Sequence, residues 1–231
     1  MSPRPKRHQQ ITNLPEAIKA AAWQQIAELG VPGLSLRAIG RALRITAPAI
    51  YNYFPDRDAL VTALIVDAFT SFGQALEAAR DAQPAGDHAA RFTAIGLAYR
   101  AWAVAHPGRF MLIFGTPVPG YEFKGDLGPA PLKSFLVLVG VLDEALRAGA
   151  LRLPEGYVRW TSTLQAQART LCSMNLAQDP QSIYLGIEAW AKVHGLTSLE
   201  LYGHLPDFLE GSLEDFWLSE MDAYTRLLFG K

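Results

Sequence analysis

The sequence is poor in the residues that build redox and metal centres. It contains a single cysteine, Cys172, so neither an intramolecular disulfide nor a cysteine-rich zinc site can form. Glu200 and His204 are four residues apart but lack a third ligand, and no glycine-rich phosphate loop is present. Packing explains His194 and Cys172 better than catalysis does. We therefore expect a reducing, cytoplasmic environment, no metal, no cofactor and no enzymatic activity.

Long hydrophobic runs are also absent. The longest strongly apolar run covers residues 135–142, well short of the ~20 residues that span a bilayer. The first ten residues, MSPRPKRHQQ, are basic, but no apolar segment follows them. We expect neither export nor a membrane span. A hydrophobic content of 50% over 231 residues is enough for a substantial core.

Alternation of polar and apolar residues, the pattern of a half-buried strand, is not evident either. Apolar residues instead recur at helical spacing between Pro and Gly residues, which predicts an all-α fold. The proline- and glycine-rich segment 116–131 should be a loop. The expected helices cover residues 14–29, 36–43, 47–54, 57–81, 88–105, 109–115, 131–148, 155–178, 181–203 and 212–229.

Charge is unevenly distributed, although the net charge is only −1. Residues 1–57 hold eight Lys and Arg against three acidic residues, a balance of +5, whereas the rest of the chain carries −6. A basic N-terminal module on an acidic body suits attachment to phosphates, but ordinary variation in solvated charge gives the same totals. Arg4, Lys6 and Arg7 either follow DNA phosphates or enter the minor groove, or else they belong to a disordered tail that only aids solubility.

Two short helices joined by a tight turn are predicted early in the chain, which is the arrangement of a helix-turn-helix. Ser35 should cap the first helix. Thr46 should be the N-cap of the second, and Pro48 lies in its first turn, where a missing amide hydrogen costs nothing. A two-turn helix is marginal alone. Ile50 and Phe54 must therefore hold it against its neighbours.

The remaining side chains of this segment suit contacts with a DNA duplex. Small residues at the start of the second helix allow a close approach to a groove, and hydroxyl, amide and guanidinium groups can bond to base edges or phosphates. The amides at the start of the helix from residue 57 add to these donors. The predicted DNA-contacting residues are Ser35, Arg37, Arg44, Thr46, Ala47, Pro48, Ala49, Tyr51, Asn52, Tyr53 and Arg57.

Residues 14–66 resemble the DNA-binding domain of the tetracycline-repressor (TetR) family, in the motifs IKAAAWQQIAELG, LSLRAIGRAL, TAPAIYNYF and PDRDAL. The resemblance implies a three-helix DNA-binding domain. We expect a flexible basic N-terminal arm over residues 1–13 before it. Arg44 departs from the family, which very often has glycine in this turn. If the turn requires a positive φ, arginine costs ~1 kcal/mol there. We then expect a slightly different turn, or a phosphate contact by Arg44.

Residues 67–231 are similar to one C-terminal type of this family. The similarity lies in AYRAWAVAHPGRFMLIFG and EAWAKVHGLTSLELYGH, and its Trp-His-Gly signature corresponds to Trp190, His194 and Gly195. It implies a helical domain that binds a ligand and dimerises through its last two helices. The last helix also has an apolar face wide enough for both its own domain and a partner. The expected interface residues are Trp190, Leu213, Phe216, Trp217, Tyr224 and Leu228.

A regulator needs an input, and an apolar cavity in this domain would suit a hydrophobic small-molecule effector. An aromatic stripe at helical spacing also fits a plain core. Arg169 fits either an anionic partner or the surface. The expected effector-pocket residues are Tyr99, Trp102, Phe110, Phe114, Trp160, Gln167, Arg169 and Met174.

The sequence thus predicts a transcriptional regulator, a ligand-responsive repressor that binds a palindromic operator in double-stranded DNA as a homodimer. An effector would favour a pose in which the helix from residue 57 tilts and the spacing of the two modules is lost. Two alternatives remain. A helical enzyme that handles small molecules would have no salt-dependent affinity for any duplex, and a constitutive DNA binder would respond to no ligand.

Overall fold

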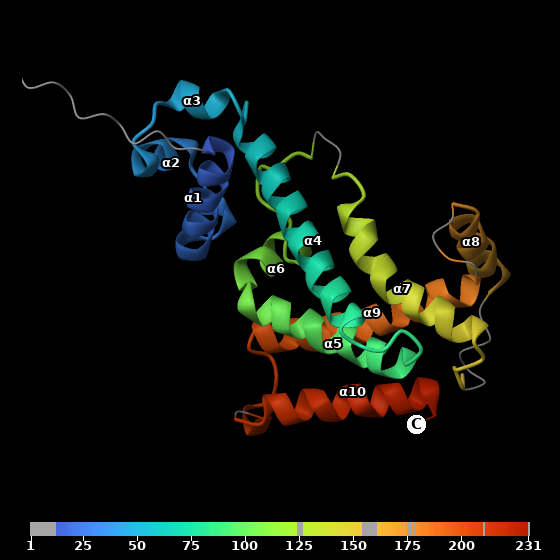
Figure 1. Cartoon of the computed structure of the whole chain (residues 1–231). Helices are drawn as coiled ribbons and strands as arrows, with labels where there is room; N and C mark the ends of the chain where they lie inside the picture. Colours follow the sequence, from blue (N-terminus) through green and yellow to red (C-terminus); the bar gives the residue numbers. More distant parts are fainter. Residues whose placement is uncertain are drawn as a thin grey trace, which may run out of the picture. The chain divides into compact units, whose positions relative to one another are not determined.

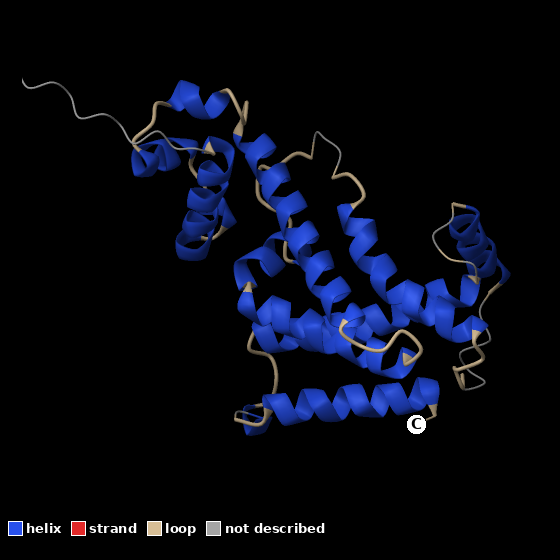
Figure 2. Ribbon diagram, in the orientation of Figure 1, coloured by secondary structure: helices blue, strands red, loops and turns tan. Residues whose placement is uncertain are grey.

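The computed structural model describes residues 13–123, 127–153, 161–174, 177, 179–209 and 211–230. Every regular element in these ranges is a helix, which confirms the all-α fold (Figure 2). The elements, labelled as in Figure 1, are α1 Leu14–Leu29, η1 Val31–Gly33, α2 Leu36–Leu43, α3 Ala47–Tyr51, α4 Arg57–Asp81, α5 His88–Ala105, α6 Pro107–Phe114, α7 Ala130–Arg147, α8 Ser162–Ser173, α9 Pro180–Leu201, η3 Asp207–Leu209 and α10 Leu213–Phe229.

The chain separates into two compact units. The first comprises Met1–Ile65 and Met111–Asp126, and the second comprises Val66–Phe110 and Leu127–Lys231. The start of α4 belongs to the first unit and the remainder of this helix to the second. Each unit has its own set of buried apolar side chains, and the two are described separately below.

The first unit is built on a small core shared by α1, α2 and α3. Asn13 caps α1, because its Oδ1 accepts a hydrogen bond from the amide of Glu16 at 3.4 Å. The segment after α6 joins this unit through Tyr121, whose hydroxyl lies 2.9 Å from that of Thr62 on α4. The buried apolar side chains of the three helices and their connections are Ile18, Ala22, Ile26, Leu34, Ile39, Ile50 and Phe54.

The second unit packs α5, α7, α9 and α10 around a larger core, with α8 against α9 (Figure 1). Helices α5 and α10 approach closely at Gly96, where an added Cβ would lie 2.4 Å from Cε of Met221. Helices α7 and α9 do the same at Gly186, where a Cβ would lie 2.6 Å from Cγ2 of Val139. The largest buried side chains of this unit are Trp217, Phe72, Phe92, Phe110, Leu76, Leu142 and Leu185.

Two helices differ clearly from the predicted limits. The predicted helix 47–54 ends at Tyr51, because residues 52 and 53 form a turn. The predicted helix 155–178 is shorter within the described residues and covers Ser162–Ser173. Thr161 caps it by accepting a hydrogen bond from the amide of Leu164 at 3.3 Å. The other predicted helices begin and end within two residues of the observed limits.

Helix α4 is the one described helix that is long and apolar enough to cross a bilayer by length and composition alone. Its most apolar window is 44% buried inside the protein. The buried side chains include Leu60 and Leu64 in the first unit, and Phe72 and Leu76 in the second. Burial of this kind is what a core helix shows, so α4 is weak evidence for a membrane span.

Candidate nucleic-acid interface

The first helix of the helix-turn-helix, α2, is held in place at its start. The hydroxyl of Ser35 accepts a hydrogen bond from the amide of Ala38 at 3.3 Å, as predicted for an N-cap. The amide of Ser35 in turn donates to Oε1 of Gln25 on α1 at 3.0 Å. These two bonds fix the angle at which the chain enters α2, so Ser35 has a structural task in addition to any contact with DNA.

The chain leaves α2 in a Schellman motif, the helix ending that glycine usually allows. The amide of Ile45 donates to the carbonyl oxygen of Gly40 at 2.9 Å, and the amide of Arg44 donates to that of Arg41 at 3.2 Å. Arg44 occupies the left-handed position of the motif, with φ 56° and ψ 39°. Among the described non-glycine residues, Arg44 alone has a positive φ. The turn therefore keeps the conformation of glycine, at a cost of about 1 kcal/mol to an arginine.

Gly40 explains why this turn can be so tight. A Cβ at this position would lie 3.2 Å from the carbonyl oxygen of Ile45, which is closer than most such contacts. The absence of a side chain at Gly40 lets the backbone of the turn lie directly on α2. The turn then delivers Thr46 to the N-cap position of α3, where its hydroxyl makes no capping hydrogen bond and is exposed. Thr46 is therefore the N-cap residue, as predicted, but its side chain adds no hydrogen bond to the cap.

Helix α3 is anchored by its inner face, as the sequence predicted. Ile50 is fully buried and Phe54 is 8% exposed. The amides of Tyr53 and Phe54 both donate to the carbonyl oxygen of Ile50 at 2.9 Å, so the chain turns sharply at the end of the helix. Since a five-residue helix is not stable alone, these contacts are what hold it.

The outer side of α3 and the turn after it are open to solvent. Tyr51 is 46% exposed and Tyr53 is 50% exposed, and their neighbour Asn52 is exposed as well. Of the small residues at the start of α3, Pro48 is exposed, whereas Ala47 and Ala49 are half-buried. The segment thus presents two phenol hydroxyls and one amide beside a narrow helix start, which are groups that bond to phosphates and base edges.

Arg57 is tied into the protein itself. Its Nη2 donates to the carbonyl oxygen of Val31 at 3.2 Å, and Nη1 lies 3.7 Å from Oδ1 of Asp58. Arg57 therefore links the start of α4 to η1, and a phosphate contact would have to share its guanidinium with these partners. Asp56 caps α4 as predicted, because its Oδ1 accepts a hydrogen bond from the amide of Ala59 at 2.7 Å.

The sequence matches known families over most of its length. Residues 18–64 match the family described as "Bacterial regulatory proteins, tetR family". Residues 92–224 match the family described as "Tetracyclin repressor-like, C-terminal domain". The chain belongs to the TetR family of transcriptional regulators. It is accordingly a DNA-binding regulator with an N-terminal helix-turn-helix domain and a larger helical C-terminal domain.

Similar proteins agree with this assignment. An HTH-type transcriptional regulator of Mycobacterium tuberculosis strain H37Rv is 34% identical over 212 residues, which cover 89% of this chain and 86% of the relative. The crystal structure of the regulatory protein SCO4313 has a TM-score of 0.70 at 30% identity and covers 96% of this chain and 98% of its own. A protein of unknown function from Rhodococcus sp. RHA1 has a TM-score of 0.72 at 26% identity, with coverages of 98% and 100%.

The TetR-type C-terminal unit contains a polar pair of a buried tyrosine and a half-buried histidine that the sequence did not predict. The hydroxyl of Tyr99 on α5 lies 2.8 Å from Nδ1 of His194 on α9. The ring of Phe110 stacks on the imidazole, with centroids 5.7 Å apart, and the hydroxyl of Ser198 lies 3.4 Å from Nε2. Burial lowers the pKa of His194 and raises that of Tyr99, so both groups are neutral near pH 7.

A small apolar cavity lies beside this pair. The volume that the centre of a water molecule can occupy in it is about 20 Å³, which is room for about one water molecule. Its wall includes Phe92, Gly96, Tyr99, Trp190 and Met221. Of the predicted effector-pocket residues that the structure describes, only Tyr99 lines it. The cavity is therefore too small, as it stands, for a ligand of ordinary size.

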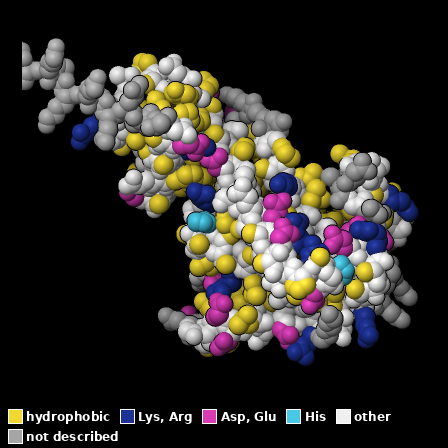
Figure 3. All heavy atoms as spheres, viewed as in Figure 1, with side chains coloured by type: hydrophobic (Ala, Val, Ile, Leu, Met, Phe, Trp, Pro, Cys, Tyr) yellow, Lys and Arg dark blue, Asp and Glu magenta, His cyan; other side chains and the backbone are white. Residues whose placement is uncertain are grey.

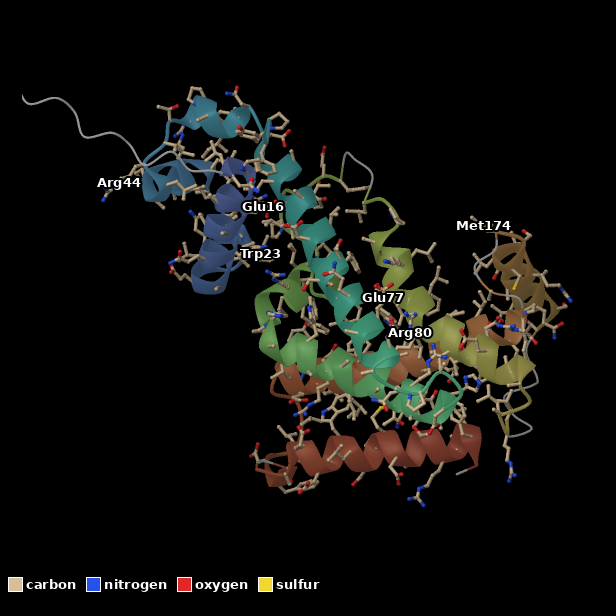
Figure 4. All side chains as sticks on the ribbon, in the orientation of Figure 1. Glu16, Trp23, Arg44, Glu77, Arg80 and Met174 are labelled. Atoms are coloured by element: carbon tan, nitrogen blue, oxygen red, sulfur yellow. The ribbon has the colours of Figure 1, made fainter. Side chains whose placement is uncertain are left out.

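The other predicted pocket residues lie in several places. Trp102 is buried and donates from Nε1 to the hydroxyl of Ser71 at 3.0 Å, and Phe110 packs on the imidazole described above. Phe114 belongs to the first unit and is half-buried. Three residues are exposed on or at the end of α8, and Trp160 lies outside the described residues. The three exposed residues are Gln167, Arg169 and Met174, the last of which is labelled in Figure 4.

The predicted dimer residues are buried or half-buried within the C-terminal unit. Trp217, Tyr224 and Leu228 are at most 6% exposed and pack inside their own protomer. Trp190, Leu213 and Phe216 are half-buried. The large apolar side chains that α9 and α10 do expose are Ile187, Leu199, Leu218 and Leu227. The predicted interface residues do not include these four, because α10 is apolar on more than one side and periodicity does not say which side is inward.

Proposed function

We propose that the protein is a ligand-responsive transcriptional repressor that binds a palindromic operator as a homodimer in the cytoplasm. The DNA-binding part of this proposal is supported by the α3 segment, which has one buried side and one exposed side. Ile50 and Phe54 are buried, while Tyr51, Asn52 and Tyr53 are exposed. A helix this short, anchored on one side and rich in hydrogen-bonding groups on the other, suits insertion into a major groove.

We extend the proposal to domain organisation. Residues 14–66 form the DNA-binding domain and residues 67–231 the effector-binding and dimerisation domain. Residues 1–13 form a basic arm, of which residues 1–12 lie outside the described part of the chain. The matched family regions, 18–64 and 92–224, fall within these two domains and support the division.

Dimerisation is supported by the apolar side chains that α9 and α10 leave open. Ile187 is 55% exposed, Leu218 47% and Leu227 45%. Burial of such side chains against a second copy would stabilise a two-fold dimer. Two α3 helices related by that axis would reach half-sites about one DNA turn, or a multiple of it, apart.

The effector response is supported by the apolar core around Tyr99 and His194. An effector must favour one conformation over another, and coupling of this kind is typically worth ~1 to 3 kcal/mol. Because the cavity of about 20 Å³ has room for about one water molecule, an effector would have to open it. The same observation favours a constitutive DNA binder as the second candidate.

The decisive experiment is selection of bound sequences from a random duplex pool with the purified full chain. We expect a palindromic site whose half-sites are one or two turns apart, bound with steep salt dependence. Transcription in vitro from a promoter carrying that site should fall when the protein is added. A site without two-fold symmetry would contradict the dimeric mode, and increased transcription would contradict repression. Absence of any duplex affinity would contradict the whole proposal.

A further inference from the structure

Three arginines form a stripe along α2 and the turn that follows it. Arg37 and Arg41 are four residues apart and share one side of α2, Arg44 follows in the turn directly after the helix, and all three are exposed. No hydrogen bond or ion pair joins the side chain of any of them to the residues that the structure describes. Figure 4 shows the side chain of Arg44 pointing away from the helices of its unit.

The acidic residues within residues 13–65 of this unit do not neutralise this stripe. Glu16 pairs with Lys19 at 2.8 Å, and Glu28 accepts a hydrogen bond from Gln24. Asp56 and Asp58 are engaged at the start of α4, where one caps the helix and the other lies beside Arg57. By contrast, acidic and basic side chains are intermixed on the face of the second unit that Figure 3 shows. The arginine stripe is thus a concentrated positive charge without a partner among the described side chains.

Arg44 is also unsuited to its own backbone conformation. The Schellman position that it occupies, with φ 56°, favours glycine because a Cβ crowds the backbone there. Glycine would make the same turn with less strain and without the charge. A strained residue in an exposed position indicates a role of its side chain rather than of its backbone.

We propose that Arg37, Arg41 and Arg44 bind successive phosphates along one strand of a DNA duplex, and that Arg44 is present in the turn for its charge. This inference rests on the proposed function. The stripe extends ~10 Å along α2 and the turn, whereas three successive phosphates of one strand span two axial rises, ~7 Å, a difference that long arginine side chains can bridge. The guanidinium fork suits phosphate oxygens, and the first helix of a helix-turn-helix commonly crosses the backbone. Arg44 lies two residues before Thr46, so the stripe ends where α3 begins.

Arg44→Gly tests the inference because its two expected effects have opposite signs. The midpoint of thermal unfolding should rise by a few degrees, since the left-handed strain is relieved. Affinity for DNA should fall, since a phosphate contact is lost. A residue with a merely structural role would change affinity and stability in the same direction. Arg44→Lys keeps the charge and should retain most of the affinity with no gain in stability.

The readout is the salt dependence of binding, measured by fluorescence anisotropy with two probes. One probe is a duplex recovered by selection, and the other is a mixed-sequence 30-base-pair duplex. Each lost phosphate contact should reduce the slope of log K against log salt by about 0.9, which is roughly an eightfold loss of affinity at 0.1 M salt. Arg41→Gln and Arg37→Gln should act in the same way. Both probes should be affected equally, because a phosphate contact carries no sequence information.

Arg226→Gln is the matched control, because it removes an exposed arginine from α10 and should leave the slope unchanged. An unchanged slope in the three α2 variants, while the wild-type protein binds steeply, would overturn this inference and leave the proposed function intact. A loss confined to the selected duplex would overturn it in favour of base contacts. Loss of binding to phosphatidylglycerol vesicles but not to DNA would overturn it in favour of a membrane surface. A wild-type protein without duplex affinity would overturn both proposals.

Discussion

The hydroxyl of Tyr99 on α5 lies 2.8 Å from Nδ1 of His194 on α9, inside the C-terminal unit. Tyr99 is 3% exposed, and Phe110 stacks on the imidazole. A buried hydroxyl and a half-buried imidazole satisfy each other in this way, which joins two helices that are far apart in sequence. The pair also borders the apolar cavity through Tyr99.

We expect protonation of His194 to destabilise the folded protein. Burial lowers the pKa of His194 below its ordinary value of 6.5. The unfolded chain therefore binds this proton more readily than the folded one, so the stabilising contribution is complete above pH 6.5 and is lost as the pH falls through the lower, folded pKa. Thermal unfolding at pH 7.5 and at pH 5.5 should show a smaller drop for His194→Gln than for the wild-type protein.

His106 is a second source of acid sensitivity. Burial, and to a lesser extent the nearby charge of Arg109, lower its pKa as well. His106→Gln should remove part of the acid sensitivity, and the double variant should remove more than either single change. If His194→Gln lost stability between these two pH values as steeply as the wild-type protein, protonation of the imidazole would not be a source of the sensitivity.

Tyr51 and Arg57 were both predicted to grip the DNA backbone, but the structure distinguishes them. Tyr51 is 46% exposed, so Tyr51→Ala should weaken binding to a selected duplex about tenfold while the midpoint of unfolding stays nearly constant. Arg57 donates to the carbonyl oxygen of Val31, so Arg57→Ala should also cost ~1 kcal/mol of stability. Anisotropy titration and urea unfolding measure the two effects. Unchanged affinity in Tyr51→Ala would rule out the predicted contact of that residue.

Much of the N-terminal unit could be predicted because its signals are local. Ser35 and Asp56 cap helices through bonds to amides three residues later, and Pro48 marks a helix start by its own covalent structure. The positive φ of Arg44 was considered only as one option for the turn, since an arginine in a sequence does not by itself indicate a positive φ. The glycine that the family usually has in this turn indicated a positive φ, and the observed φ of Arg44 is indeed positive, at 56°.

The C-terminal unit was harder to predict because packing between distant helices decides it. Trp217 and Leu218 are adjacent apolar residues on α10, yet the first is fully buried and the second is 47% exposed. Nothing in their spacing says which one faces the core. The contact between Tyr99 and His194 likewise joins residues 95 positions apart. Gly96 could have been noticed as a small residue within a helix, but its close neighbour Met221 could not.

Leu218 and Trp217 provide a test of the proposed dimer surface. Leu218→Glu places a charge on the exposed side of α10, so we expect a shift from dimer to monomer with unchanged helical content. Trp217→Ala removes a fully buried ring and should cost about 3–5 kcal/mol of folding stability instead. Light scattering after gel filtration measures the mass, and circular dichroism measures the helix content. Leu29→Glu, at a side chain that is 64% exposed on α1, is the control. A dimer that survives Leu218→Glu but not Leu29→Glu would move the interface to the N-terminal unit.

The close approach of α5 and α10 predicts that Gly96→Ala is destabilising. The added Cβ would lie 2.4 Å from Cε and 2.7 Å from Sδ of Met221, so the thioether must move or the helices must separate. Overpacking of this kind costs about 1–3 kcal/mol, measured as a lower free energy of unfolding in urea. Met221→Val removes the clashing atoms, so the double variant should be less destabilised than the sum of the two single changes. Gly195→Ala, where an added Cβ meets nothing within 4 Å, is the matched control and should not be destabilising. Equal stability of the two alanine variants would mean that Met221 moves away at no cost and that the contact does not hold the two helices in register.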